Sequence, residues 1–215
     1  MLQLESFVFG PFQENTYVLY DDNSGDGIIL DPGCYQDHEN QQLLEFVTDN
    51  RINITKIVNT HCHIDHVLGN EFAKVKFNAP LAIPEGEQEV YRAVKSYAPV
   101  YGFPKYKESE IDEFIDESDV LRFGEISLEI MLVPGHSPGH LAFYHKDSKI
   151  CIGGDVLFQG SIGRTDLPGG DHQTLINSIH TKMFLLPDDV TVYCGHGPPT
   201  TIGEEKKSNP FCALV

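Results

Sequence analysis

The stretch Thr60-His61-Cys62-His63-Ile64-Asp65-His66 places three imidazoles and one carboxylate within six residues. Each of these side chains would need a polar partner inside a protein core, so the run is not typical of a core segment. It directly follows the apolar run 56–59, which predicts a strand that ends there and becomes a loop. Alternate side chains of an extended chain point to the same side, so His61 and His63 should converge. Two converging imidazoles suit a divalent ion such as zinc.

Three later segments repeat this layout. In each, a β-rich apolar run ends in Gly or Pro-Gly and is followed by His or Asp. Glycine at such a point allows a sharp turn and a close approach of the backbone to a neighbour. Four strand ends that bring His or Asp to one rim predict a metal centre. The three segments are Pro134-Gly135-His136, Gly153-Gly154-Asp155 and Gly195-His196-Gly197.

The set of ligands predicts two ions. One ion would be held by His61, His63 and His136, and the other by Asp65, His66 and His196. Asp155 would bridge them through its two carboxylate oxygens. Each ion would keep an open position for water, which is typical of a catalytic rather than a structural metal site. We expect two zinc ions, with iron or manganese as the alternatives.

HxHxDH followed by a later His, Asp and His resembles the ligand series of the metallo-β-lactamase fold superfamily. The segments 134–140, 154–158 and 161–166 (PGHSPGH, GDVLF and SIGRTD) resemble those of the glyoxalase II-like, hydroxyacylglutathione hydrolase-like enzymes. The resemblance extends from about Glu14 to Phe211. It implies an α/β fold in four layers, an αββα sandwich of two mixed sheets between helices, with the metals at one sheet edge.

Two features differ from glyoxalase II itself. That enzyme carries a C-terminal helical domain with basic residues for glutathione, and we expect this domain to be absent because the chain stops soon after His196. The Gly-Cys-Gly-Arg stretch of the family is Ser161-Ile162-Gly163-Arg164 here. Shorter glyoxalase II-like proteins with the Ser-Ile-Gly-Arg version look similar. The acyl group and the thiol carrier therefore stay open.

The expected function is metal-dependent hydrolysis of a small ester-like bond, preferably a thioester. Two zinc ions would lower the pKa of a shared water from about 15.7 toward about 7. They would thereby supply a hydroxide nucleophile for the carbonyl and a positive charge to stabilise the oxyanion. Asp65 and Asp155 would hold this hydroxide and relay a proton. A thiolate leaving group needs little acid assistance, which favours a thioester over an amide.

Three other functions are possible on the same fold. A persulfide dioxygenase on the same fold would use one iron held by His61, His136 and Asp155, a two-histidine, one-carboxylate set. Two zincs would favour hydrolysis, and one iron would favour the oxygenase. A metal-dependent scaffold without activity is disfavoured because all seven ligands are intact. β-Lactam hydrolysis is disfavoured because the sequence shows no export signal.

Composition limits the partners. The 215 residues include 15 Lys+Arg and 32 Asp+Glu, a formal charge of −17. Binding of nucleic acid phosphates requires an excess of Lys and Arg, and an acidic protein is repelled by anionic membranes. Five cysteines without a CxxC pair favour a reducing compartment. The sequence therefore predicts a soluble, cytoplasmic protein of one domain, residues 1–215, acting on a small molecule, with its oligomeric state open.

The segment 85–118 interrupts this regular pattern. After a helix expected at 87–97 it holds prolines, aromatics and an acidic run, so we interpret it as an irregular, lid-like excursion. Its part 98–107 combines basic and aromatic groups in an otherwise acidic chain, and these are candidate substrate contacts. They are Tyr101, Lys105, Tyr106 and Lys107.

Several single residues have two interpretations. Arg164 could bind a substrate carboxylate or pair with Asp166 or Asp171 to hold its loop. Asp31, at a strand end, is expected to orient a ligand histidine or to cap a turn. His140 is expected to support the ligands rather than to bind metal.

The remaining elements follow from periodicity. Asp171 is expected to cap the last helix. Helices are expected at 37–50, 69–77, 87–97 and 173–182. Strands are expected at 4–9, 16–20, 28–30, 56–59, 121–123, 126–133, 141–145, 149–153 and 190–195.

Overall fold

The structure, a computed structural model, describes residues 1–214. The chain divides into two units. The first contains Met1–Ile115 and Arg122–Ser127, and the second contains Asp116–Leu121 and the chain from Leu128 onward. Helices and strands occur in both units, so the predicted α/β class is confirmed. The expectation of one domain stays a prediction.

A six-stranded mixed sheet forms the centre of the first unit, in the order β1-β2-β3-β4-β5-β6. β1, β2 and β3 pair antiparallel, and the pairs from β3 to β6 are parallel. β3, between antiparallel β2 and parallel β4, carries a continuous apolar run, Ile28-Ile29-Leu30, and all three side chains are buried, as expected for a central strand. The strands are β1 (Leu2–Phe9), β2 (Glu14–Asp21), β3 (Asp26–Leu30), β4 (Asn53–Val58), β5 (Leu81–Pro84) and β6 (Glu113–Ile115).

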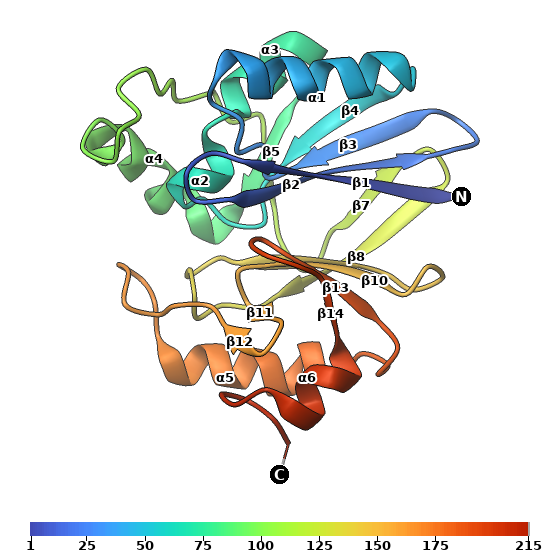
Figure 1. Ribbon diagram of the computed structural model, residues 1–215, viewed down its shortest axis with the longest axis vertical. Coiled ribbons are helices and arrows are strands. Elements are labelled where there is room, and N and C mark those ends of the chain that lie inside the picture. Colours follow the sequence, from blue (N-terminus) through green and yellow to red (C-terminus); the bar gives the residue numbers. More distant parts are fainter. Residues whose placement is uncertain (215) are drawn as a thin grey trace. The chain divides into compact units, whose positions relative to one another are not determined.

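Helices of the first unit pack on this sheet through apolar side chains at helical spacing. Leu43 and Val47 of α1 are four residues apart and both are buried in one hydrophobic core with residues of α3 and α4. Figure 1 shows α1 and α3 along one face of the sheet. The helices are α1 (Asp37–Asp49), α2 (Ile64–Val67), α3 (Asn70–Phe77), the 3₁₀ turn η1 (Glu85–Glu87) and α4 (Gln88–Tyr97).

The second sheet has the order β14-β13-β10-β9-β8-β7. β8 is antiparallel to β9, β9 is antiparallel to β10, and β10 is parallel to β13. β8, β10 and β13 therefore run in the same direction, and their carboxyl ends lie at the same edge. The strands are β7 (Val120–Phe123), β8 (Ile126–Leu132), β9 (Leu141–His145), β10 (Ile150–Gly154), β13 (Thr191–Cys194) and β14 (Thr200–Thr201), and a separate hairpin holds β11 (Leu157–Phe158) and β12 (Ser161–Ile162).

In the second unit, α5 (His172–Thr181), η2 (Met183–Leu185) and α6 (Ile202–Ser208) pack on this sheet (Figure 1). The predicted cap of α5 is confirmed: the Asp171 carboxylate accepts the Thr174 amide at 2.7 Å. Each unit thus has a sheet with helices on it, the two halves that an αββα sandwich requires. In the part of the chain that the structure describes, no helix is long and apolar enough to cross a membrane.

The segment 85–118 is more regular than the sequence indicated. It begins with η1 and α4, and β6 inside it pairs in parallel with β5 as an edge strand of the first sheet. The acidic run is held by side chains from that unit, because Lys74 pairs with Asp112 and Lys56 pairs with Glu113. The short strands β5, β6, β11, β12 and β14 were not expected from the sequence, and neither were the short helices α2 and α6.

Acid should weaken the hydrogen bonds that Asp21, the last residue of β2, accepts. The Asp21 carboxylate accepts the amino group of Met1 at 3.0 Å and the amide of Glu125 at 3.1 Å. These two hydrogen bonds, the amino group first, lower the pKa of Asp21 to about 2. A carboxyl whose folded pKa is depressed contributes stability above its unfolded pKa and loses it as the pH falls toward 2. Asp21→Asn should therefore flatten the fall of the free energy of unfolding between about pH 4 and 2.

Urea denaturation at each pH measures this effect. The exposed neighbour Asp22 provides the matched control, since Asp22→Asn removes the same charge without these hydrogen bonds. If the free energy of unfolding of Asp21→Asn falls between about pH 4 and 2 as steeply as that of wild type, the role given to Asp21 is wrong.

Candidate metal centre

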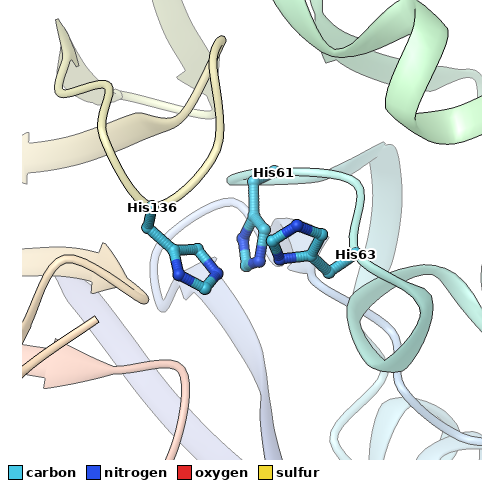
Figure 2. Close-up of side chains that lie close together, drawn as sticks. All are labelled: His61, His63 and His136. Atoms are coloured by element: carbon cyan, nitrogen blue, oxygen red, sulfur yellow. The ribbon is translucent and has the colours of Figure 1, made fainter. Parts of the chain in front are cut away.

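His61 and His63 lie in the first unit on the loop after β4, and His66 lies on α2. The rings of His61 and His63 are perpendicular with centroids 4.8 Å apart, and Figure 2 shows both on the same loop. The ring of His66 lies 4.1 Å from that of His61. The predicted convergence of His61 and His63 is thus confirmed. Cys62, between them, is buried in the hydrophobic core, as the alternation of an extended chain requires.

Asp31 holds this loop from the neighbouring strand. β3 and β4 are parallel, so Asp31 after β3 lies beside the residues that follow β4. Its Oδ1 accepts the Thr60 amide at 2.7 Å, and its Oδ2 accepts the Thr60 hydroxyl at 2.6 Å. The same Oδ2 lies 3.1 Å from His66 Nδ1. Asp31 therefore orients a ligand histidine, which is the first of its two predicted roles.

These contacts fix two histidine tautomers. The Thr60 hydroxyl donates its proton to Asp31, so its oxygen accepts from His61 Nδ1 at 3.0 Å. His66 Nδ1 likewise donates to the Asp31 carboxylate. Both imidazoles then carry their proton on Nδ1 and leave the Nε2 lone pair for a metal. In the same helix, Asp65 Oδ2 lies 3.9 Å from His66 Nε2.

Glu14, which the sequence did not single out, adds a second buried carboxyl. Its Oε1 lies 4.0 Å from His66 Nδ1, and its Oε2 accepts the Thr16 hydroxyl at 2.9 Å. Burial raises the pKa of Glu14 well above its ordinary value, although the neighbouring His66 opposes this shift. A single glutamate at the start of a strand carries no signal by which the sequence could have revealed this place.

The second unit holds three candidate ligands at one sheet edge. His136, Asp155 and His196 follow β8, β10 and β13, as the strand-end pattern predicted. Asp155 Oδ2 lies 3.5 Å from His136 Nε2 and 3.4 Å from His196 Nε2. Two ligands of one tetrahedral zinc, each at 2.0–2.1 Å, are about 3.3 Å apart. The Asp155 carboxylate therefore lies at ligand spacing from both imidazoles. Figure 2 shows His136 on the loop after β8.

Hydrogen bonds tie these ligand loops together. His136 Nδ1 donates to the Arg164 carbonyl at 2.7 Å, which leaves Nε2 as its metal donor. The Asp155 amide donates to His140 Nε2 at 3.0 Å, so His140 supports a ligand as predicted. Gly163 is required here by space: a Cβ at this position would lie 1.9 Å from the Asp155 carbonyl oxygen.

Arg164 pairs with Asp166 in the structure. Its Nε and Nη2 donate to the two carboxylate oxygens, each at 2.7 Å. Because Asp171 caps α5 instead, the contact favours the loop-holding interpretation with Asp166 as the partner. A substrate role of Arg164 stays a prediction.

The segment 98–107 lies in the first unit. Tyr101, Lys105 and Lys107 are exposed, and the ring of Tyr101 lies 5.5 Å from that of Tyr97. Tyr106 differs from the other three candidates, because it is partly buried and packs against the core. Burial raises its pKa above the ordinary range. Substrate contact by Tyr106 and by the other three residues stays a prediction.

Donor chemistry fits a transition metal. Imidazole nitrogens with fixed tautomers and carboxylate oxygens are ligands that suit zinc, iron and manganese. Within the first unit, the ligand atoms of Asp31, His61 and His66 lie within 4.8 Å of one another. Asp31 already accepts hydrogen bonds with both oxygens, so His61 and His66 are the candidate metal donors of this group. We conclude that both units carry histidine-rich candidate metal sites.

Comparisons with known proteins agree with this arrangement. Residues 9–196 match the metallo-beta-lactamase superfamily. Hydroxyacylglutathione hydrolase GloC of Haemophilus influenzae is 37% identical, with 98% of each chain covered. The mitochondrial persulfide dioxygenase ETHE1 of Mus musculus is 31% identical over 93% of this chain and 71% of its own length.

Two solved structures share the fold over nearly the whole chain. The BLEG-1 B3 metallo-beta-lactamase is 35% identical with a TM-score of 0.88, covering 97% of this chain and 99% of its own. TTHA1623 in a di-iron-bound form is 31% identical with a TM-score of 0.83, covering 96% and 99%.

Proposed function

Because the chain belongs to the metallo-β-lactamase superfamily, we propose that it is a two-zinc thioester hydrolase acting on hydroxyacyl thioesters of glutathione. The relative GloC carries that activity in its name and matches this chain over 98% of both lengths. The match therefore supports a glutathione carrier although the sequence alone left the thiol open.

The position of Asp155 is the observation that carries the proposal. Its Oδ2 is at ligand spacing from both His136 and His196, which suits a carboxylate shared by two ions. His61, His63 and His136 would hold one ion. Asp65, His66 and His196 would hold the other. The hydrogen-bonded tautomers of His61, His66 and His136 support Nε2 ligation throughout.

Two divalent ions in this site would supply a water of lowered pKa and a Lewis acid for the substrate carbonyl. Residues of the chain itself move the proton and keep the carboxylates in place. Asp65 and Asp155 accept and hold the proton that the attacking water loses. His140 fixes the backbone of Asp155, so its carboxylate stays in place while the proton moves. A thiolate leaves without a proton donor, which fits a site built from imidazoles and carboxylates.

Metal analysis and a substrate panel test the proposal. Two zinc ions per chain are expected, with cleavage of a 2-hydroxyacyl glutathione thioester. The panel also contains glutathione persulfide with oxygen uptake as its signal, and a β-lactam. Failure to cleave any thioester in a protein loaded with two zinc ions would overturn it.

A persulfide dioxygenase is the second candidate. The mouse relative carries this activity in its name, and His61, His136 and Asp155 would supply the required two-histidine, one-carboxylate set. One iron per chain with oxygen uptake on the persulfide would establish it. The metal alone does not decide, because the di-iron neighbour has iron in a two-metal form. β-Lactam cleavage is tested because the BLEG-1 neighbour is described as a β-lactamase. A cytoplasmic location stays a prediction.

Exposed lysines should affect the KM for acidic substrates. In a chain of charge −17, glutathione must rely on local cations, and Lys105 and Lys107 are exposed on the segment 98–107. Each exposed ion pair contributes about 0.2–1 kcal/mol, so Lys105→Gln with Lys107→Gln should raise the KM for a glutathione thioester about two- to thirtyfold. The kcat should change little, the pattern of lost uniform binding.

Steady-state kinetics with acidic and neutral thioesters measure this effect. The exposed pair Lys76→Gln with Lys95→Gln removes the same net charge elsewhere in the first unit and serves as the control. The effect should shrink as salt rises, because exposed charges are screened beyond about 10 Å at 0.1 M. Equal losses on acidic and neutral thioesters would show that the lysines shape their loop instead.

A further inference from the structure

A buried glutamate outside the ligand series holds the loop between two ligands. The backbone amide of Cys62, between His61 and His63, donates to Glu87 Oε2 at 2.9 Å. Glu87 is fully buried, whereas Glu85 and Glu89 on either side are exposed. A buried carboxylate is costly unless hydrogen bonds compensate it, so its place under this loop needs a reason.

The loop needs support because it lies outside the sheet. Residues 60–63 follow β4 without regular secondary structure, so they lie beyond the ladder of the sheet, whose last amide here is that of Asn59, donating to the Ala82 carbonyl. Two carboxylates accept hydrogen bonds from the loop amides at alternate residues. Asp31 accepts the amide of Thr60 at 2.7 Å, and Glu87 accepts the amide of Cys62. The side chains that alternate with these amides are the two ligands. Their relative orientation therefore depends on both carboxylates.

Glu87 comes from a well-anchored element. It is the last residue of η1 and directly precedes α4. α4 is fixed to the core by Tyr91 and Val94, both buried, and the Tyr91 hydroxyl hydrogen-bonds the backbone of Ser109. A support on a packed element holds a site more accurately than one on a loop.

We infer that Glu87 is a positioning residue of the metal centre, which sets the angle between the His61 and His63 imidazoles through the Cys62 amide. The inference rests on the proposed function only in taking these two histidines as ligands of one ion. Without an acceptor, the Cys62 amide is unpaired in the interior, and the loop must relax to pair it. The two imidazoles then no longer meet one ion at the angle that it requires.

Metal binding by variants of the full chain tests the inference. Glu87→Met keeps the volume but removes the acceptor, and Glu87→Gln keeps an acceptor oxygen without the charge. Glu89→Met changes an exposed glutamate two residues away and is the control. Each apoprotein is titrated with zinc against a chromophoric chelator. The visible spectrum of each cobalt-substituted protein reports ligand geometry independently of turnover.

Loss of a group that supports a ligand typically weakens metal binding 10–100-fold. We expect Glu87→Met to weaken one of the two zinc ions by about this factor and to shift the cobalt bands. The zinc affinity of Glu87→Gln should stay within about threefold of that of wild type, and the affinity of Glu89→Met should equal that of wild type. Wild-type affinity and spectrum in folded Glu87→Met would overturn the inference, and so would an equal loss in folded Glu87→Gln.

A further variant covers the case in which Glu87→Met does not fold. Glu87→Asp keeps the charge but withdraws the acceptor by one methylene, so it should bind zinc more weakly than Glu87→Gln. If it binds zinc as tightly as wild type, the inference is wrong. Wild-type protein that binds no metal would contradict the proposed function, whereas two ions bound equally by wild type and Glu87→Met would contradict only the role of Glu87.

Discussion

Replacing Asp155 with alanine is expected to weaken both metal ions and to lower the hydrolase activity by at least about three orders of magnitude. Asp155 Oδ2 lies 3.5 Å from His136 Nε2 and 3.4 Å from His196 Nε2. Its loss removes one ligand from each proposed ion and one proton acceptor. The backbone of the variant should keep its support, because His140 bonds the amide and not the side chain.

Metal content after gel filtration and turnover of the thioester measure this effect. Cys62→Ala is the control, because it also changes a residue within a ligand loop. Burial raises the pKa of this thiol well above its ordinary value, and its side chain lies in the core, so its loss should leave metal content and activity nearly unchanged. Two tightly bound ions with full turnover in Asp155→Ala would show that the ligand assignment is wrong.

Asp31 should have the second largest effect, and its two variants should separate folding from metal binding. Asp31→Ala leaves the Thr60 amide, the Thr60 hydroxyl and His66 Nδ1 without their common acceptor. Breaking a buried charged contact of this kind costs about 3–5 kcal/mol. For a chain of this size that corresponds to a fall in Tm of roughly 10 °C.

Asp31→Asn should fold better but bind metal poorly. The amide oxygen can still accept the Thr60 amide, whereas the amide nitrogen would face the donors at Thr60 and His66. His66 then loses the acceptor that keeps its proton on Nδ1, and the ion it binds should weaken by about 10–100-fold. Thermal unfolding and zinc titration give the two readouts, with the exposed Asp37→Asn as the control. A Tm and zinc affinity equal to wild type in both Asp31 variants would contradict this role.

Local sequence determined much of the site. An extended chain alternates its side chains, so the convergence of His61 and His63 follows from their spacing alone. The cap of α5 by Asp171 is equally local, since donor and acceptor are three residues apart. The ends of strands β8, β10 and β13 could be identified because each apolar run stops at glycine or proline. The superfamily followed from this ligand series.

Contacts between residues far apart in sequence were decided only by the tertiary structure. Glu85, Glu87 and Glu89 are chemically alike, yet only Glu87 is buried, because the packing of η1 and α4 places it under a loop twenty-five residues away. The short edge strand β6 exists because β5 offers it a partner, and three residues carry no period of their own. Burial and pairing of this kind depend on which surfaces meet in the folded chain, and no local pattern contains that information.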